Sequence, residues 1–146
     1  MPSVYQKSGL QFAYPENWEL IEGENDEALV EVMLRSPGAA FWSLTVFPGL
    51  RDTQALLAEV VQAMQAEYPD LEREPVDSLV GGQSLAGVEL RFVCLDFTNT
   101  AQVHVYHHDG DTHLLLRQAE DREWKVMEPV FGAMTLSLQS DTPLAD

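Results

Sequence analysis

Cysteine is nearly absent from this sequence, because Cys94 is the one cysteine among 146 residues. This count excludes a disulfide within the chain and any Cys-x-x-Cys metal or redox motif. No apolar run approaches the ~20 residues that a membrane-spanning helix needs. The first seven residues, Met1 to Lys7, also lack the apolar segment of a secretory signal. We therefore expect a cytoplasmic protein with no membrane partner.

Basic residues are also scarce, with 8 Lys and Arg against 24 Asp and Glu, which gives a formal net charge of −16. The basic residues are scattered along the chain, apart from Arg122 and Lys125. Binding to DNA, RNA or an anionic lipid surface is therefore not expected, since these partners need clustered positive charge. A basic protein partner or a metal ion would suit such a field, but acidity also serves solubility.

Signatures of common enzymes are missing as well. The sequence has no Gly-x-Ser-x-Gly nucleophile elbow, no Gly-x-x-x-x-Gly-Lys phosphate loop, no His-Glu-x-x-His motif and no Rossmann glycine fingerprint. These absences favour a protein that is not an enzyme and has no cofactor. Enzymes built from scattered residues carry no such signature, so this expectation rests on missing motifs alone.

What the sequence does contain is enough apolar material for one folded domain. Hydrophobic residues make up 45% of the chain, including three Trp, six Phe and four Tyr. This composition argues against disorder, and the length suits a single domain over residues 1–146. No repeat or interdomain linker interrupts it. The last residues, 140–146, are expected to be a frayed tail.

The clearest structural signal is the pair Asp109-Gly110 between two β-rich segments, 101–108 and 111–118. Asp-Gly is favoured in a two-residue type I′ turn, where both central residues need a positive φ. This turn sets the register of the hairpin and predicts that His108 pairs with Asp111. Each further pair then follows along the two strands, for example Tyr106 with His113.

This register separates the side chains of the hairpin into two faces. The first face is apolar and carries Val103, Val105, Leu114 and Leu116. The second face carries His104, Tyr106, His108, His113 and Arg117, with Leu115 among them. A preceding strand over 85–98, joined by a turn at 98–101, adds Val88, Leu90, Phe92 and Cys94 to the first face, and Arg91, Val93, Leu95 and Phe97 to the second. That strand is apolar on both faces near its end, which predicts a sheet covered at least partly on each side.

The remaining elements define the fold class. Strands are predicted at 9–14, 18–21, 29–36 and 41–47, with a weaker edge strand at 71–80 that contains Pro75. Apolar residues at helical spacing predict one helix from Asp52 or Thr53 to Tyr68, and a second that starts near Glu120 and carries an apolar stripe from Trp124 to Leu138. Hairpins predominate, so the class is α+β, an antiparallel β-sheet with two helices packed on it.

The segment from Leu10 to Trp18 (Leu-Gln-Phe-Ala-Tyr-Pro-Glu-Asn-Trp) resembles the N-terminal signature of the PsbP-like superfamily. Members include the photosystem extrinsic protein PsbP, a Ran-GTPase-binding nuclear transport protein, the DcrB-type proteins and the adaptor chaperones of type VI secretion effectors. The order of elements along most of the chain is similar too. The resemblance implies an α/β/α sandwich in a superfamily whose known members mostly bind proteins and do not catalyse reactions.

Two candidate sites follow from the second face. His104 and His113 are diagonal neighbours about 7–8 Å apart, with Tyr106 between them, so the pair could hold a metal ion or a small molecule. Two imidazoles are few ligands for a metal ion, however. A wet or half-buried face of the sheet would account for the same polar residues.

The other candidate is a surface that binds an unidentified protein partner. It consists of the expected outward residues Val93, Leu95, Phe97 and Tyr106, beside Arg91 and Arg117. With the resemblance and the missing enzyme motifs, this surface favours a non-catalytic interaction or adaptor domain in the cytoplasm.

Overall fold

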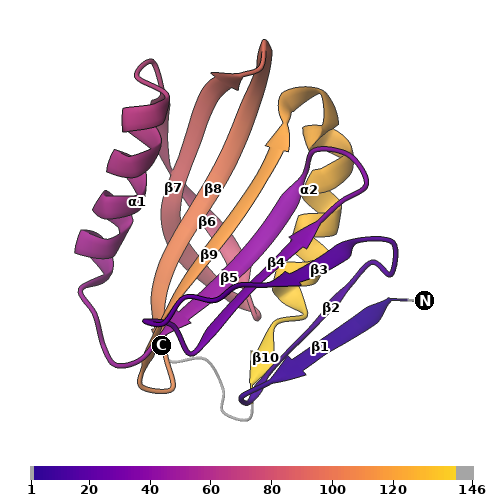
Figure 1. The fold of residues 1–146 in the computed structure, drawn as a ribbon, viewed down its shortest axis with the longest axis vertical. Coiled ribbons are helices and arrows are strands. Elements are labelled where there is room, and N and C mark those ends of the chain that lie inside the picture. Colours follow the sequence, from indigo (N-terminus) through magenta and orange to yellow (C-terminus); the bar gives the residue numbers. More distant parts are fainter. Residues whose placement is uncertain (1, 141–146) are drawn as a thin grey trace.

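The computed structural model describes residues 2–140, which form two antiparallel sheets and two helices (Figure 1). The elements in chain order are β1 (Ser3–Lys7), β2 (Leu10–Tyr14), β3 (Glu19–Glu22), β4 (Val30–Arg35), β5 (Phe41–Phe47), α1 (Thr53–Glu67), β6 (Glu72–Val80), β7 (Gln83–Cys94), β8 (Phe97–His108), β9 (Asp111–Glu120), α2 (Asp121–Leu136) and β10 (Gln139–Ser140). The predicted α+β class is confirmed. The short strands β1 and β10 were not predicted.

The large sheet has seven strands in the order β3-β4-β5-β9-β8-β7-β6, and every neighbouring pair is antiparallel. A small sheet has the order β1-β2-β10. The strand β6 lies at an edge, as its Pro75 predicts, because proline cannot donate to a neighbouring strand. Of the predicted tail 140–146, Ser140 pairs with Leu10 and the rest lies outside the described residues.

One face of the large sheet packs against α1. Its side chains form a core cluster with the apolar side of the helix, as the two periodicities predict. The cluster contains Val88, Leu90, Phe92, Ala101 and Val103 from the sheet and Val61 from α1, with Leu57, Val60, Met64, Tyr68, Cys94, Leu114 and Leu116 around them. The predicted first face of the hairpins is therefore an interior surface.

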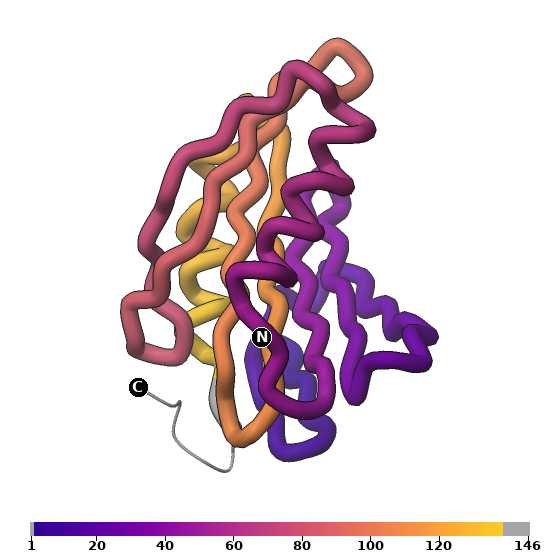
Figure 2. The backbone as a smooth tube through the Cα atoms, turned by 90° about the vertical axis from the view of Figure 1, so that its left-hand side faces the viewer, coloured from indigo at the N-terminus to yellow at the C-terminus, as the bar shows by residue number. Residues whose placement is uncertain are grey.

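The opposite face of the sheet is covered by α2 and by the small sheet, so the two helices lie on opposite sides (Figures 1 and 2). This cluster includes Val32, Leu34, Trp42, Leu44, Tyr106 and Leu115 from the large sheet, Phe12 from β2, and Phe131, Met134 and Leu138 from the end of the chain. The Trp42 indole N–H donates to Thr135 Oγ1 at 3.1 Å, which fixes α2 over β5. The molecule is thus a three-layer sandwich.

Local sequence explains where the helices begin. The Asp52 carboxylate accepts hydrogen bonds from the backbone N–H groups of Gln54 and Ala55, at 3.0 and 3.1 Å, and so caps α1. Pro69 follows the last turn of α1. Asp121 and Glu123 occupy the first turn of α2, where negative charge is favourable.

Four tight hairpin turns join the strands, and in each turn both central residues have a positive φ. Three of them use residues that tolerate this conformation, namely Ser8-Gly9, Gly81-Gly82 and Asp109-Gly110. The register predicted from Asp109-Gly110 is confirmed from His108↔Asp111 to Val103↔Leu116. The fourth turn is Leu95-Asp96, with φ angles of 52° and 69°.

The turn between β7 and β8 corrects the sequence analysis, which placed it at 98–101. Cys94 pairs with Phe97, so the chain reverses at Leu95 and Asp96. Phe97 therefore shares a face with Cys94 and not with Val93, the opposite of the prediction. The error arose because Leu-Asp lacks the glycine that marks the other tight turns, and leucine is not a turn residue.

Within residues 2–140, no helix combines the length and the apolar character that crossing a membrane requires.

The leucine in the fourth turn predicts a stabilising substitution. A left-handed conformation costs a leucine about 1–2 kcal/mol, whereas asparagine tolerates it. We expect Leu95→Asn to raise the free energy of unfolding by about 0.5–1 kcal/mol. Gly110→Ala should lower it by about 1 kcal/mol through backbone strain alone, since no atom lies within 4 Å of an added Cβ there. Urea unfolding of both variants measures this, and a destabilised Leu95→Asn protein would contradict it.

Candidate functional site

The second face of the β8–β9 hairpin, which was expected to be wet or half-buried, is fully enclosed. His104 has an exposed fraction of 0%, and His108, His113, Tyr106 and Arg117 are buried as well. The cause is the cover supplied by α2 and the small sheet, neither of which follows from the hairpin's own sequence. The polar side chains of this face are therefore part of the interior.

Arg117 on β9 is hydrogen-bonded towards the hairpin of β6 and β7, which lies at one edge of the large sheet. Its guanidinium donates to Ser78 Oγ on β6 at 2.8 Å and to Gln102 Oε1 on β8. Gln102 in turn donates to Glu89 Oε1 on β7 at 3.0 Å. Burial lowers the pKa of Arg117 to about 10. Within the described part of the chain Arg117 has no carboxylate at ion-pair distance, so its hydrogen bonds connect four strands without a salt bridge.

His104 lies against Gly87 on β7. A Cβ at Gly87 would overlap the imidazole ring of His104 and the carbonyl oxygen of Val103. Glycine at this position therefore makes room for the ring. Burial lowers the pKa of His104 to about 4, with Arg117 lowering it further and the backbone of Ala86 opposing it. The ring is neutral near pH 7.

The other two buried imidazoles contact each other, and one of them, His113, stacks with Tyr106. The rings of Tyr106 and His113 are 5.1 Å apart between centroids, and His108 meets His113 edge-on at 5.4 Å. Burial also lowers the pKa of His113 to about 4, with His108 as a second cause. Across residues 2–140, no group of three or more His, Cys, Asp or Glu side chains is placed to hold a metal ion. Among these residues the structure brings no third ligand to His104 and His113, and metal binding there stays a prediction.

The predicted interaction surface is divided by the structure. Val93 and Leu95 are exposed, at 60% and 87%, and Phe97 is partly exposed at 39%. Arg91 is exposed near them and pairs with Glu89 at 2.8 Å. Tyr106 and Arg117 are buried, so these two residues do not belong to any outer surface. The exposed members gather where β7 turns into β8, and binding through them stays a prediction.

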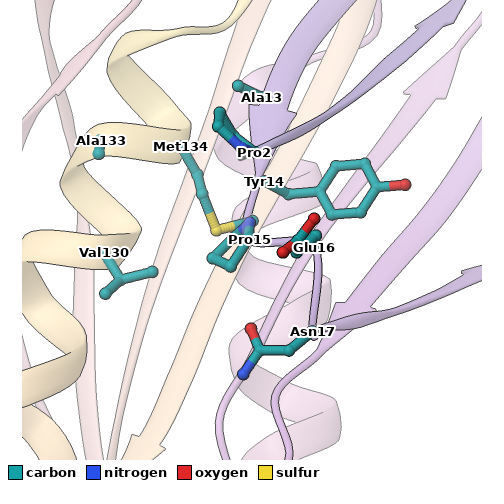
Figure 3. Close-up of a pocket in the computed structure, with 9 residues that line it drawn as sticks. All are labelled: Pro2, Ala13, Tyr14, Pro15, Glu16, Asn17, Val130, Ala133 and Met134. Atoms are coloured by element: carbon teal, nitrogen blue, oxygen red, sulfur yellow. The ribbon is translucent and has the colours of Figure 1, made fainter.

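A hollow of about 660 Å³ that sequence reasoning missed lies between the end of β2 and α2 (Figure 3). Its lining consists of Pro2, Ala13, Tyr14, Pro15, Glu16, Asn17, Val130, Ala133 and Met134. In Figure 3 the Met134 side chain extends from α2 towards Pro15. The apolar residues of this lining could contact an apolar side chain. Tyr14 to Asn17 were noticed only as a family signature, and their contact with α2 depends on residues more than 100 positions later.

Replacement of glycine by alanine is expected to change the free energy of unfolding in opposite directions at two positions. Gly87→Ala should lower the free energy of unfolding by about 1–3 kcal/mol, because the methyl group displaces the His104 ring. Gly132→Ala in α2 should raise it by about 1 kcal/mol, since alanine favours helix and no atom lies within 4 Å of the added Cβ. Thermal or urea unfolding of both variants measures this. Equal effects of the two changes would contradict the packing of His104 on Gly87.

Burial of the imidazoles also predicts a dependence of stability on pH. His104 and His113 titrate near pH 6.5 when unfolded and near 4 when folded. The unfolded state therefore binds more protons between these values, and stability falls as the pH drops through this window. Each ring contributes about 2–3 kcal/mol that is present above pH 6.5 and lost by pH 4. Urea unfolding between pH 7.5 and 5, with NMR titration of the rings, measures this. A folded-state midpoint near 6.5 for either ring would contradict it.

Comparison with known proteins supports the fold assignment alone. No family model matches the sequence, and no curated protein matches it. Among solved structures, cyanobacterial PsbP (CyanoP) from Synechocystis sp. PCC 6803 superimposes with a TM-score of 0.65 at 14% identity, over 95% of this chain and 92% of that chain.

Two further structures share the arrangement. LpqN from Mycobacterium tuberculosis, involved in cell envelope biogenesis, has a TM-score of 0.52 at 16% identity, over 95% of this chain and 88% of that one. A protein of unknown function from Pseudomonas aeruginosa has a TM-score of 0.55 at 9% identity, over 97% and 98% of the two chains. The resemblance to the PsbP-like superfamily is confirmed at the level of the fold, and this chain has the fold of PsbP.

Proposed function

We propose that this chain is a non-catalytic interaction domain that contacts another protein through the end of its β7–β8 hairpin. We call this surface the hairpin tip and define it by Val93, Leu95 and Phe97. The observation that carries the proposal is Leu95, whose side chain is 87% exposed while its backbone has a φ of 52°.

Leu95 is unfavourable for the folded domain in two ways. A bulky residue in the left-handed region is strained, and an exposed leucine side chain gains little from burial in the monomer. In the other three tight hairpins within residues 2–140, the two turn positions hold glycine, serine or aspartate and no bulky apolar residue. A strained and exposed apolar residue is best explained by a contact made outside the domain.

The side chains of Val93 and Phe97 lie on opposite faces of the hairpin and add apolar area on either side of Leu95. Val93 is 60% exposed on β7. The guanidinium of Arg122 lies 4.0 Å from the ring centre of Phe97, and Glu120 Oε1 holds it through a hydrogen bond of 2.9 Å from Arg122 Nε. Phenylalanine and arginine are enriched at protein interfaces, and arginine is frequent among the residues that dominate binding energy there. The tip lies at the far end of the long β7 and β8 strands (Figure 1).

The test uses a photo-cross-linking residue at position 95, with the same residue at position 50 as control, in extract from the native cell. Leu50 is also exposed, at 68%, and lies in the loop before α1. A protein cross-linked from position 95 and not from position 50 is then purified and its affinity for the domain is measured. We expect Leu95→Asn to weaken binding about tenfold or more, and Leu50→Asn to change it by less than about twofold.

Because Leu95→Asn is expected to stabilise the fold, a loss of binding in this variant cannot come from unfolding. Equal affinity of the wild type and the Leu95→Asn variant for the cross-linked protein would refute the hairpin tip as the contact. The same set of products from positions 95 and 50 would also count against it.

A further inference from the structure

A second feature adjoins the hairpin tip. A groove of about 390 Å³ lies between the C-terminal end of α1 and the last residues of β7. We call it the acidic groove, and its lining residues are Glu67, Tyr68, Pro69, Asp70, Leu71, Glu72, Arg91, Phe92, Val93, Thr98 and Asp121. Val93 belongs to both the groove and the tip.

The floor of the groove is apolar. Tyr68 and Phe92 stack with their ring centres 4.5 Å apart, and Leu71 packs against the same core cluster. Tyr68 also donates from its hydroxyl to Cys94 Sγ at 3.5 Å, which ties the end of α1 to β7. This floor offers a fixed apolar surface on which the side chain of a bound segment can lie.

One wall of the groove is an open strand edge. The pairing of β6 with β7 begins at Glu72↔Arg91, so among the described residues the end of β7 beyond Arg91 has β8 as its one neighbour. Backbone groups of alternate residues point to opposite neighbours in an antiparallel ladder. Those of Cys94 point to Phe97 across the two-residue turn, and those of Val93 therefore point away from β8, towards the groove.

Charge defines the kind of segment that fits. Four carboxylates line the groove, from Glu67, Asp70, Glu72 and Asp121. The negative end of the α1 dipole adds to them, since the last turn of α1 has no basic residue. Arg91 is the one cation of the lining, and it is neutralised by Glu89 at 2.8 Å and by Glu74 at 3.7 Å.

We propose that the acidic groove binds an extended segment of the partner protein that is rich in lysine or arginine. The segment adds as a short strand along Val93, places one apolar side chain on Tyr68 and Phe92, and directs its basic side chains to the four carboxylates. This inference rests on the proposed function, because it supplies the chemistry of the partner that the hairpin tip contacts.

The test uses a fluorescent peptide of alternating lysine and valine as the probe, with its glutamate-for-lysine counterpart as the control peptide. The test variant is Glu67→Gln/Asp70→Asn/Glu72→Gln. The matched control is Glu24→Gln/Asp26→Asn/Glu27→Gln, which removes the same three charges from the exposed loop between β3 and β4. The two proteins have equal net charge, so general attraction of a basic peptide to an acidic protein affects both alike.

We expect the groove variant to bind the probe about tenfold or more weakly than wild type, and the loop variant to bind within about twofold of wild type. Amide NMR signals of the end of β7 should shift on addition of the probe, with Val93 among the largest changes. Equal loss of affinity in both variants, or an unchanged Val93 signal, would overturn the groove as the site.

The two proposals fail separately. Suppose that the peptide binds the groove and loop variants with equal affinity, while Leu95→Asn still weakens binding of the cross-linked protein. The hairpin tip then stands and the acidic groove is refuted. If the peptide binds the groove while Leu95→Asn leaves the affinity for the cross-linked protein unchanged, the acidic groove stands and the hairpin tip is refuted.

Discussion

Both faces of the β8–β9 hairpin are buried, and this burial determines the role of its polar side chains. One face packs against α1, and the other lies beneath α2 and the small sheet. Polar side chains that would be expected at the surface from the sequence are therefore buried away from water. His104 and His113 become neutral packing residues with a lowered pKa, and Arg117 becomes a hydrogen-bonding link between strands of the sheet and its edge hairpin.

The same enclosure limits where a partner can bind. The two faces of the large sheet are occupied, and β6, one of its two edge strands, carries Pro75 and several charges that oppose pairing. The end of β7 differs, because it extends past the start of β6 and carries exposed apolar side chains. The hairpin tip and the acidic groove meet there at Val93, and together they offer apolar contact, an open strand edge and negative charge.

Much of the fold was predictable because its signals are local. Asp109-Gly110 set the register of β8 and β9 correctly, and helical spacing found the buried sides of α1 and α2. The turn at Leu95 was missed because leucine is not a turn residue and the pair Leu95-Asp96 contains no glycine. Periodicity shows which residues share a face and not what covers that face, so the face that carries the imidazoles was predicted to be wet or half-buried. The hollow beside Pro15 was not predicted for a similar reason, since Met134 contributes to its lining from near the other end of the chain.

The β8–β9 hairpin is enclosed on both faces, whereas the end of β7 beyond Arg91 is a strand edge that β6 does not pair with. Hydrogen exchange of backbone amides, followed by NMR at neutral pH, tests this most directly. We expect the amides of residues 102–106 and 113–117 to exchange only on global unfolding, and the amide of Val93 to exchange many times faster. Fast exchange along β8 and β9, or protection of Val93 equal to theirs in the isolated protein, would contradict it.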